Sequence, residues 1–226
     1  MDNHLLPILF QDERFVVVNK PSGLLVHRTK ISDDTIFALQ LLRDQLGQRV
    51  WPVHRIDRAA SGFLIFALSS AWAATLQEAL KNGKKHYIAW VRGLPKDDTF
   101  TVNQAIRAGR KEPKKATTHF RVIERYPKPR SSLLWAQPET GRHHQIRRHL
   151  NYASHPILLD SSHGDTRINR EWREKHELRR LALHAHTLIL TLPDNEVLRI
   201  IAPIPESLSV PLSRLGLPTT FQIPIE

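Results

Sequence analysis

The sequence predicts an α+β fold in which a mixed, mainly antiparallel sheet is flanked by helices. Two short apolar runs without helical spacing, at 15–19 and 62–68, indicate strands buried in a core. The alternating run 84–92 indicates a strand with one buried face. Apolar residues three and four positions apart predict amphipathic helices at 71–81 and 144–152. Strands and helices of these kinds are the parts from which an α+β domain is built.

The first part of the chain predicts a strand, a turn and a helix in that order. Segment 15–19 is the β-branched run F-V-V-V-N, and the K-P-S-G turn signal follows it. Ser32, Asp33 and Asp34 are candidate N-caps for a helix that ends near Leu46. The glycine after Leu46 stands where helices commonly end.

The helix predicted at 71–81 begins after a Ser-Ser pair and ends at an Asn-Gly pair. Trp72, Leu76 and Leu80 recur every four residues along it, so they lie on one side. We interpret this stripe as part of the core.

The second half of the chain predicts more strands and a basic loop. Segments 117–125 and 133–137 predict an antiparallel pair joined through a proline-containing turn. The polar stretch 95–116 is predicted to be exposed and mobile, and its basic residues form a candidate arm for contacting the backbone of an anionic polymer. Those basic residues are Arg107, Arg110, Lys111, Lys114 and Lys115. The remaining predicted parts are a central strand within 179–188, a segment at 196–203 that closes the sheet, and a short helix at 208–215.

Length and composition indicate a globular protein without cysteine chemistry. The chain has 226 residues, of which 41% are hydrophobic and 24% charged. We expect a single domain over 1–226. Because there is no cysteine, disulfides, thiolate catalysis and cysteine-ligated zinc are excluded. The N-terminal residues lack the features of a secretory signal, and we expect a cytoplasmic protein.

The net charge predicts an anionic partner. Lys and Arg total 33 against 22 acids, which gives +11, and the pI is about 10.3. Nucleic acid fits this excess better than an anionic membrane surface, because no basic amphipathic helix with a Trp/Phe/Leu face is present. Charge alone says nothing about catalysis.

The segment from His54 to Leu68 places an acid at the start of a core strand. Asp57 lies between Arg55 and Arg58, and the apolar run follows Ser-Gly. Neighbouring guanidinium groups favour the ionised form of a carboxyl group, as a catalytic carboxylate requires. A structural Asp-Arg pair on a loop is the alternative interpretation.

A second set of polar residues lies on the helix predicted at 144–152. Arg147 and Arg148 occupy one side, whereas Ile146 and Leu150 occupy the other. Such a helix buries an apolar stripe and presents guanidinium groups toward a cleft. A solvated basic face is the alternative. On strand 84–92, Tyr87 shares a face with Ala89 and Val91, and an ordinary strand tyrosine is the alternative there.

Several ordered segments together resemble motifs of the RluA family of pseudouridine synthases. H-R-I-D-R-A-A-S-G-F, from His54, resembles the family motif that carries its catalytic aspartate. The other matching segments are K-P-S-G-L-L-V-H from Lys20, K-H-Y-I-A-W-V from Lys85, T-G-R-H-H-Q-I-R-R-H-L from Thr140, and R-L-A-L-H-A from Arg180. The resemblance implies the family's catalytic domain, with a central RNA-binding cleft.

The resemblance also implies roles for individual residues. Asp57 becomes the catalytic residue, Tyr87 lies against the target base, and Arg147 pairs with Asp57. Arg55 fills the space that an everted nucleotide vacates. The expected RNA-contacting residues are His54, Arg55, Arg58, Lys85, Arg142, His144, Gln145 and Arg148. The sequence leaves open whether Asp57 approaches C1′ of the ribose or C6 of the base.

No cofactor or metal is expected, because moving uracil from N1 to C5 neither oxidises nor hydrolyses anything. His184 and His186 on a predicted strand could suggest a metal pair, but neither cysteine nor clustered acids accompany them. We interpret both histidines as structural.

The segment H-G-D-T-R-I-N-R from His163 resembles the sequence of one subgroup of the family, which acts on uridine 65 in the T stem of transfer RNA. The chain departs from the family pattern at Ala60, Leu159 and Leu192-Pro193, which affects loop geometry rather than catalytic groups. Ribosomal RNA is the rival substrate. The competing classes are a non-catalytic RNA-binding module and a His/Asp phosphodiesterase. We expect a monomer.

Overall fold

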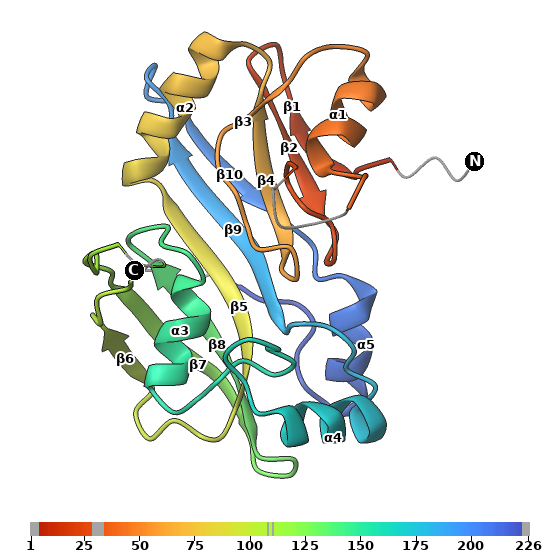
Figure 1. Cartoon of the computed structure of the whole chain (residues 1–226), viewed down its shortest axis with the longest axis vertical. Coiled ribbons are helices and arrows are strands. Elements are labelled where there is room, and N and C mark those ends of the chain that lie inside the picture. Colours follow the sequence, from red (N-terminus) through yellow and green to blue (C-terminus); the bar gives the residue numbers. More distant parts are fainter. Residues whose placement is uncertain (1–4, 29–33, 108, 110, 223–226) are drawn as a thin grey trace. The chain divides into compact units, whose positions relative to one another are not determined.

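The computed structural model describes residues 5–28, 34–107, 109 and 111–222, which group into two compact units (Figure 1). Unit 1 comprises Met1–Lys84 and Ala185–Pro203, and unit 2 comprises Lys85–His184 and Ile204–Glu226. The prediction of a single domain over the whole chain stays a prediction. Among the described residues, no helix is both long enough and apolar enough to cross a membrane.

Unit 1 is a twisted sheet with two helices. Its strands follow the order β1 (Ile8–Gln11), β2 (Phe15–Lys20), β4 (Ser61–Ala67) and β9 (Leu183–Thr191), with β3 (Trp51–Pro52) on β4 and β10 (Val197–Ile201) on β9. The pairs β1–β2, β2–β4, β3–β4 and β9–β10 are antiparallel. The helices are α1 (Ala38–Leu46) and α2 (Ser70–Asn82).

The core of unit 1 forms where β2 and β4 meet α1. Every residue of β4 is buried, as predicted for a strand covered on both faces. Val16 and Val18 of β2 pack with Leu64 and Phe66 of β4, and Leu42 of α1 joins the same cluster. Burial of such aliphatic and aromatic side chains stabilises the fold by roughly 1.5–3 kcal/mol each.

Unit 2 contains a four-stranded sheet and three helices. Its strands follow the order β5 (Lys84–Arg92), β8 (Ser131–Pro138), β7 (Thr118–Tyr126) and β6 (Thr99–Val102), all antiparallel to their neighbours. The helices are α3 (Gln145–Tyr152), α4 (Thr166–His176) and α5 (Glu206–Arg214). Helix α3 packs on β7 and β8.

Most predicted elements are confirmed within a residue or two. The strands predicted at 15–19, 62–68 and 84–92 are β2, β4 and β5, and the predicted antiparallel pair is β7 and β8. The helix predicted at 71–81 is α2, and Ser69 caps it by accepting a hydrogen bond from the Trp72 amide. Within the predicted apolar stripe, Leu76 and Leu80 are buried, but Trp72 is only partly buried.

The predicted start of the first helix is wrong. Helix α1 begins at Ala38, and no side chain caps it. Carbonyl groups of the preceding loop satisfy its first amides instead, because Ala38 N donates to Leu25 O and Leu39 N to Val26 O. Of the predicted caps, Ser32 and Asp33 lie outside the described residues.

The stretch predicted to be exposed and mobile at 95–116 contains ordered structure. Strand β6 lies within it, and Ile106 and Lys114 exchange two backbone hydrogen bonds of 2.9 and 3.0 Å. Ile106 and Ala116 are buried, which anchors both ends of the basic loop. Arg110 lies outside the described residues.

Helix α4 was not predicted, because its sequence carries little apolar signal. The helix has the sequence T-R-I-N-R-E-W-R-E-K-H, and its buried residues are Asn169 and Trp172. Asp165 caps it by accepting a hydrogen bond from the Ile168 amide at 3.0 Å. Its position therefore depends on a cap and one large aromatic side chain.

Gly62 brings the start of β4 close to the backbone of β9. Its φ is +116°, a conformation that residues with a side chain rarely adopt. A Cβ atom at this position would lie 2.0 Å from the carbonyl oxygen of Ala185. The glycine of the Ser-Gly motif is therefore required by both backbone conformation and space.

Substituting Gly62→Ala is expected to lower the free energy of unfolding by about 2–6 kcal/mol, since strain and overpacking each contribute about 1–3 kcal/mol. Gly47→Ala is the matched control, because Gly47 also has positive φ, at +64°, but a Cβ added there would meet nothing within 4 Å. It should lower the free energy of unfolding by only about 1–2 kcal/mol. Urea unfolding measures both, and equal effects would contradict the close approach.

Candidate active site

The predicted catalytic aspartate lies in the loop between β3 and β4. The backbone turns there, because the amide of Ala60 donates to the carbonyl of Asp57 at 3.1 Å. The Asp57 side chain is partly exposed, and that of Arg55 is exposed. Within the described part of the chain, Arg55 makes no hydrogen bond or ion pair. Its guanidinium group is thus available for a ligand.

The buried side chain of Lys20 stabilises this loop. Its side chain is fully buried, and its ammonium group donates to the carbonyls of Pro21 at 2.7 Å, Leu24 at 2.7 Å and Arg58 at 3.2 Å. An ammonium group has three donors, so these three acceptors replace the water it loses on burial. The lysine of the K-P-S-G motif therefore ties that turn to the Asp57 loop, a role that sequence reasoning missed.

Further contacts join the same two segments. Ser22 Oγ donates to the carbonyl of Ala59 at 2.6 Å. The amide of Gly23 donates to the carbonyl of Arg58, and Arg58 Nε donates back to the carbonyl of Gly23. Arg58 also forms an exposed ion pair with Asp34 at 2.9 Å. Arg58, predicted to contact RNA, is thus mainly occupied in fixing the loop.

His54 is also held by the protein. The amide of Ile65 donates to His54 Nε2 at 3.2 Å, and the imidazole lies 5.7 Å from the ring of Phe63. An imidazole nitrogen that accepts a hydrogen bond carries no proton, so Nε2 is the unprotonated nitrogen of the His54 ring. His54 therefore positions the chain immediately before Asp57.

Strand β5 supplies the second predicted group. Tyr87 is half-buried, and its neighbour across β8 is the small residue Ala136. Lys85 is also half-buried, and burial lowers the pKa of its ammonium group. Lys85 and Tyr87 both belong to the first half of β5.

Arg147 of α3 is buried against Asp160. Arg147 Nε donates to Asp160 Oδ2 and Nη2 to Oδ1, both at 2.8 Å, and the two side chains are 6% and 0% exposed. This two-point geometry fixes the plane of the guanidinium group as well as its position. Sequence reasoning gave no role to Asp160, whose chain position offers no signal of this contact.

Asp160 stays ionised because several donors surround it. Burial raises the pKa of its carboxyl group. The hydrogen bonds and the charge of Arg147 lower this pKa by more than burial raises it. The amides of Ser162 and His163 also donate to Oδ1, at 2.9 and 3.0 Å. The net result is a pKa below the ordinary value.

The turn before Asp160 has an unusual backbone. Leu159, which replaces a family glycine, has φ +59°. Asn169 of α4 holds this turn on both sides, since its Oδ1 accepts from the Leu159 amide and its Nδ2 donates to the Asp160 carbonyl, both at 2.9 Å. Helix α4 thereby fixes the carboxylate that fixes Arg147.

Gln145, predicted to contact RNA, is buried and joins three segments. Its Oε1 accepts from Thr140 Oγ1 at 2.6 Å and from the Arg142 amide at 3.0 Å. Its Nε2 donates to Thr117 O at 2.9 Å and to Thr118 Oγ1 at 3.1 Å. Two acceptor and two donor sites are thus used within the protein, which makes Gln145 a positioning residue.

His149 completes this network and was missed by sequence reasoning. It is fully buried, with Nδ1 2.9 Å from Thr118 Oγ1 and Nε2 2.9 Å from the carbonyl of Gln104. Because a carbonyl can only accept, Nε2 carries the proton and the ring is neutral in this pairing. Burial lowers the pKa of His149, which also favours the neutral form.

The other predicted RNA contacts surround the start of α3. His144 adopts φ +54° before the helix, stacks on His143 and places Nδ1 3.1 Å from His163 Nε2. Arg142 is exposed, and Arg148 is half-exposed. Both donate to carbonyls of the basic loop, Arg142 to Lys115 and Arg148 to Arg107.

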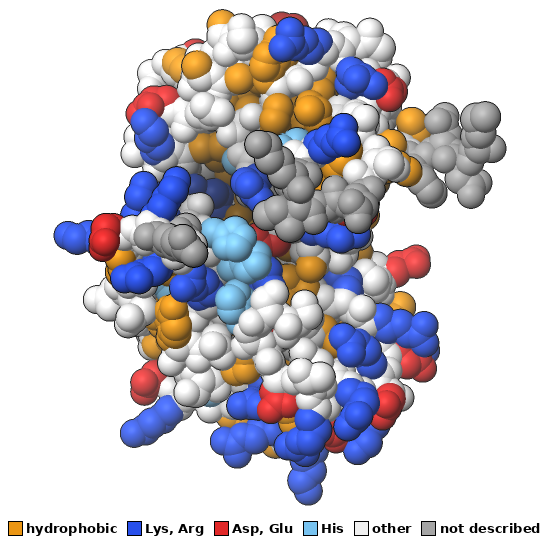
Figure 2. Space-filling view, viewed as in Figure 1, with side chains coloured by type: hydrophobic (Ala, Val, Ile, Leu, Met, Phe, Trp, Pro, Cys, Tyr) orange, Lys and Arg blue, Asp and Glu red, His pale blue; other side chains and the backbone are white. Residues whose placement is uncertain are grey.

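The candidate site residues therefore form two sets. The loop around Asp57, with His54, Arg55 and Arg58, belongs to unit 1, whereas Lys85, Tyr87 and the residues of α3 belong to unit 2. The predicted pairing of Asp57 with Arg147 joins these sets and stays a prediction. Lys and Arg side chains predominate over acidic ones on the face shown in Figure 2.

The histidines of the β9 motif are buried. His184 and His186 are 0% and 3% exposed, and His186 Nδ1 lies 2.7 Å from Thr187 Oγ1. Among the residues that the structure describes, no three His, Cys, Asp or Glu side chains form a group that could hold a metal ion.

The family assignment follows from comparison with known sequences. The family model for RNA pseudouridylate synthase matches residues 14–152, which include the Asp57 loop, β5 and α3. The chain therefore belongs to the RNA pseudouridylate synthase family, a class of RNA isomerases.

Similar proteins of known name align with most of this chain. A protein from Pectobacterium carotovorum named tRNA pseudouridine synthase C is 40% identical over 84% of this chain, which spans 56% of that relative. One from Vibrio parahaemolyticus with the same name is 38% identical over 89% of this chain and 92% of its own length. The solved structure of human RNA pseudouridylate synthase domain containing 1 is 25% identical, with a TM-score of 0.75 over 93% of this chain and 89% of the other.

Substituting Asp160→Ala is expected to lower the free energy of unfolding by about 3–5 kcal/mol, because it leaves the Arg147 charge buried without its partner. Asp44→Asn is the control, since Asp44 forms an exposed ion pair with Arg43 and should contribute less than about 1 kcal/mol. Because the Asp160 pKa is lowered by folding, its stabilisation is complete above the ordinary carboxyl pKa and lost as pH falls through the folded-state pKa. Urea unfolding at several pH values should show the wild type and Asp160→Asn converging in acid, and a constant difference would contradict this.

Proposed function

We propose that this protein converts uridine 65 in the T stem of transfer RNA to pseudouridine, with Asp57 as the catalytic residue. The observation that carries the proposal is the partly exposed carboxylate of Asp57 on a loop fixed by Lys20, in a chain of this family. The names of the similar bacterial proteins support transfer RNA as the substrate. The position of the target uridine, in the T stem, is carried over from the subgroup that the H-G-D-T-R-I-N-R segment resembles.

The reaction exchanges one glycosidic bond for another. The bond from C1′ to N1 breaks, uracil rotates, and a bond from C1′ to C5 forms. C5 loses a proton and N1 gains one, so no redox partner or water is consumed. Asp57 acts as the nucleophile or stabilises the charge that develops as the base detaches.

Tyr87 and Arg147 assist Asp57 in this proposal. Tyr87 stacks on the uracil and can relay a proton, although a phenol of ordinary pKa near 10 needs activation to act as a base at neutral pH. Arg147 keeps Asp57 ionised and oriented. The fork to Asp160 would hold the guanidinium plane constant while the substrate changes.

A uridine within a stem must leave the helix before it can react. Extrusion requires a few kcal/mol of unstacking and unpairing, which the protein must offset. Arg55 is exposed and unpaired among the described residues, so it can enter the vacated space. Lys85, Arg142, His144 and Arg148 would contact the neighbouring backbone, while His54, Arg58 and Gln145 hold the loops that present them.

Substituting Asp57→Asn is expected to reduce pseudouridine formation by at least about 10³-fold while RNA binding changes little, because the amide keeps the shape but not the charge. Asp97→Asn, at an exposed acid, is the matched control and should leave the activity unchanged. Tritium release from [5-³H]uridine-labelled transfer RNA measures the reaction. Full activity of Asp57→Asn would overturn the mechanism.

Mapping pseudouridine in total RNA from cells with and without the protein tests the target. Loss of the modification at transfer RNA position 65 alone is the expected result. Loss at a ribosomal position would establish the rival substrate. An unchanged map, together with an Asp57→Asn variant indistinguishable from wild type, would favour a non-catalytic RNA-binding module.

The basic loop is expected to supply part of the salt-dependent affinity. Replacing Lys111, Lys114 and Lys115 with Gln should reduce the slope of log K against log salt by about 0.7–0.9 for each lost phosphate contact. Replacing three exposed cations elsewhere, Lys81, Lys96 and Arg199, with Gln controls for the change in net charge. Filter binding at several salt concentrations measures the slope, and equal slopes for wild type and loop variant would remove this loop from the interface.

A further inference from the structure

Unit 2 contains a cavity of about 550 Å³ that the catalytic proposal does not use. Four segments enclose it: the end of β5, the turn between β7 and β8, the turn after α3, and one side of α4. Its size lies within the range of small-ligand sites in proteins. The cavity could therefore accept a group as large as a nucleotide.

Two guanidinium groups line this cavity. Arg92 ends β5, and Arg130 lies beside it because the amide of Gly93 donates to the carbonyl of Arg130. Arg130 is exposed, and its guanidinium group has no hydrogen-bond or ion-pair partner among the described residues. Arg92 lies 3.6 Å from Asp165, an exposed pair of little strength. Both cations remain available to an anion.

The acidic residue in the wall does not cancel this charge. Glu171 of α4 accepts a hydrogen bond from Lys175 at 2.9 Å, and this hydrogen bond lowers its pKa. The carboxylate is thus balanced within its own helix. Paired guanidinium groups match the geometry of phosphate oxygens better than a single ammonium group does.

The rest of the wall suits the nucleoside part of a nucleotide. Pro129 and Ile168 provide apolar contacts, and Trp172 lies beneath His176 with 4.6 Å between ring centroids. His155 Nδ1 lies 3.1 Å from the carbonyl of Arg92, which can only accept, so Nδ1 carries a proton and donates to it. The wall thus combines aromatic, apolar and hydrogen-bonding groups.

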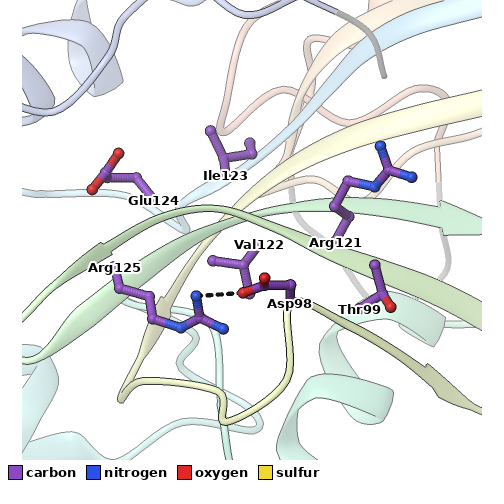
Figure 3. A pocket seen from close by; sticks show the side chains of 7 residues that line it. All are labelled: Asp98, Thr99, Arg121, Val122, Ile123, Glu124 and Arg125. Carbon is purple, nitrogen blue, oxygen red and sulfur yellow. Dashed lines mark hydrogen bonds and ion pairs between the residues drawn. The ribbon is translucent and has the colours of Figure 1, made fainter. Parts of the chain in front are cut away.

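A second cavity, beside β6 and β7, lacks these properties. It has a volume of about 500 Å³, and Figure 3 shows two arginines along it, of which Arg125 is directed at Asp98. That ion pair measures 2.7 Å, and Arg125 also donates to the carbonyl of Pro95. Two carboxylates, those of Asp98 and Glu124, therefore oppose the remaining guanidinium group of Arg121, and the lining contains no aromatic side chain.

We propose that the cavity beside Arg92 and Arg130 binds one nucleotide of the substrate RNA at a distance from the target uridine. The phosphate would lie between the two guanidinium groups, with ribose or base against Pro129 and Ile168. Arg92 lies five residues after Tyr87 on β5, or about 17 Å along the strand, so this nucleotide is not the one being isomerised. The proposal rests on RNA as the substrate and deepens the proposed function.

The variants Arg130→Gln and Arg92→Gln/Arg130→Gln test the phosphate contact. Each is expected to weaken RNA binding by about three- to tenfold per charge at moderate salt, and to reduce the salt slope by about 0.7–0.9 per contact. The rate at saturating RNA should stay the same, so the loss appears in KM and not in kcat. Arg173→Gln is the matched control, because Arg173 is exposed on α4, the helix that forms one side of the cavity, but does not line the cavity itself.

A single thiol reports occupancy directly, because the chain contains no cysteine. Ser154→Cys places a thiol in the wall of the cavity, and Ser207→Cys on α5 places an exposed control thiol outside it. Substrate RNA is expected to slow alkylation of the thiol at 154 at least fivefold and to leave that at 207 unchanged. Uridine monophosphate at the same concentration should protect neither.

The outcomes separate this proposal from the proposed function. Unchanged salt slopes together with an unprotected thiol at 154 would overturn it. Protection by uridine monophosphate, with RNA binding unaffected in the Arg variants, would also overturn it and indicate a small-molecule site. If RNA bound the wild type and protected the thiol of the Ser154→Cys variant, but the wild type formed no pseudouridine, the proposed function would fail while this cavity would remain an RNA site.

Discussion

The buried ion pair between Arg147 and Asp160 is the interaction on which the candidate residues of unit 2 depend. A guanidinium group with 6% of its side chain exposed is stable there only if a fixed carboxylate compensates the water it has lost. Asp160 meets that need because Asn169 and two loop amides hold it in turn. The order of support therefore runs from helix α4 to the carboxylate of Asp160 and then to the guanidinium group of Arg147.

Unit 1 uses the same principle with a different cation. Lys20 is buried, and its ammonium group donates to three backbone carbonyl oxygens, which fix the turn and the loop that carry them. One of those carbonyls belongs to Arg58, next to Asp57. In each unit the contacts of a buried cation, Lys20 or Arg147, fix the local geometry. Asp57 and Tyr87, which are proposed to act on the base, remain partly exposed. Rigid support behind an accessible group is what catalysis by positioning requires.

Sequence reasoning located the strands and the candidate reactive groups but not the groups that support them. The roles predicted for Asp57, Tyr87 and Arg147 come from the family motifs that surround them, and local patterns alone left a structural role open for each. Lys20 and Asp160 act over contacts between separate segments, which spacing along the chain does not encode. Gln145 shows the same limit, since its motif suggested an RNA contact but its four hydrogen bonds stay within the protein. Helix α4 escaped prediction because two buried residues give little periodic signal.

Leu159 shows how a departure from a family motif can leave the supporting geometry intact. The position requires positive φ, which explains a glycine in relatives and costs a non-glycine residue about 1–2 kcal/mol. The Leu159 side chain is 5% exposed, and burying a leucine stabilises by roughly 1.5–3 kcal/mol, enough to offset the strain. Its amide still donates to Asn169, so the turn keeps the conformation that presents Asp160 to Arg147. The substitution therefore changes how the turn is stabilised while the carboxylate that it carries stays in place.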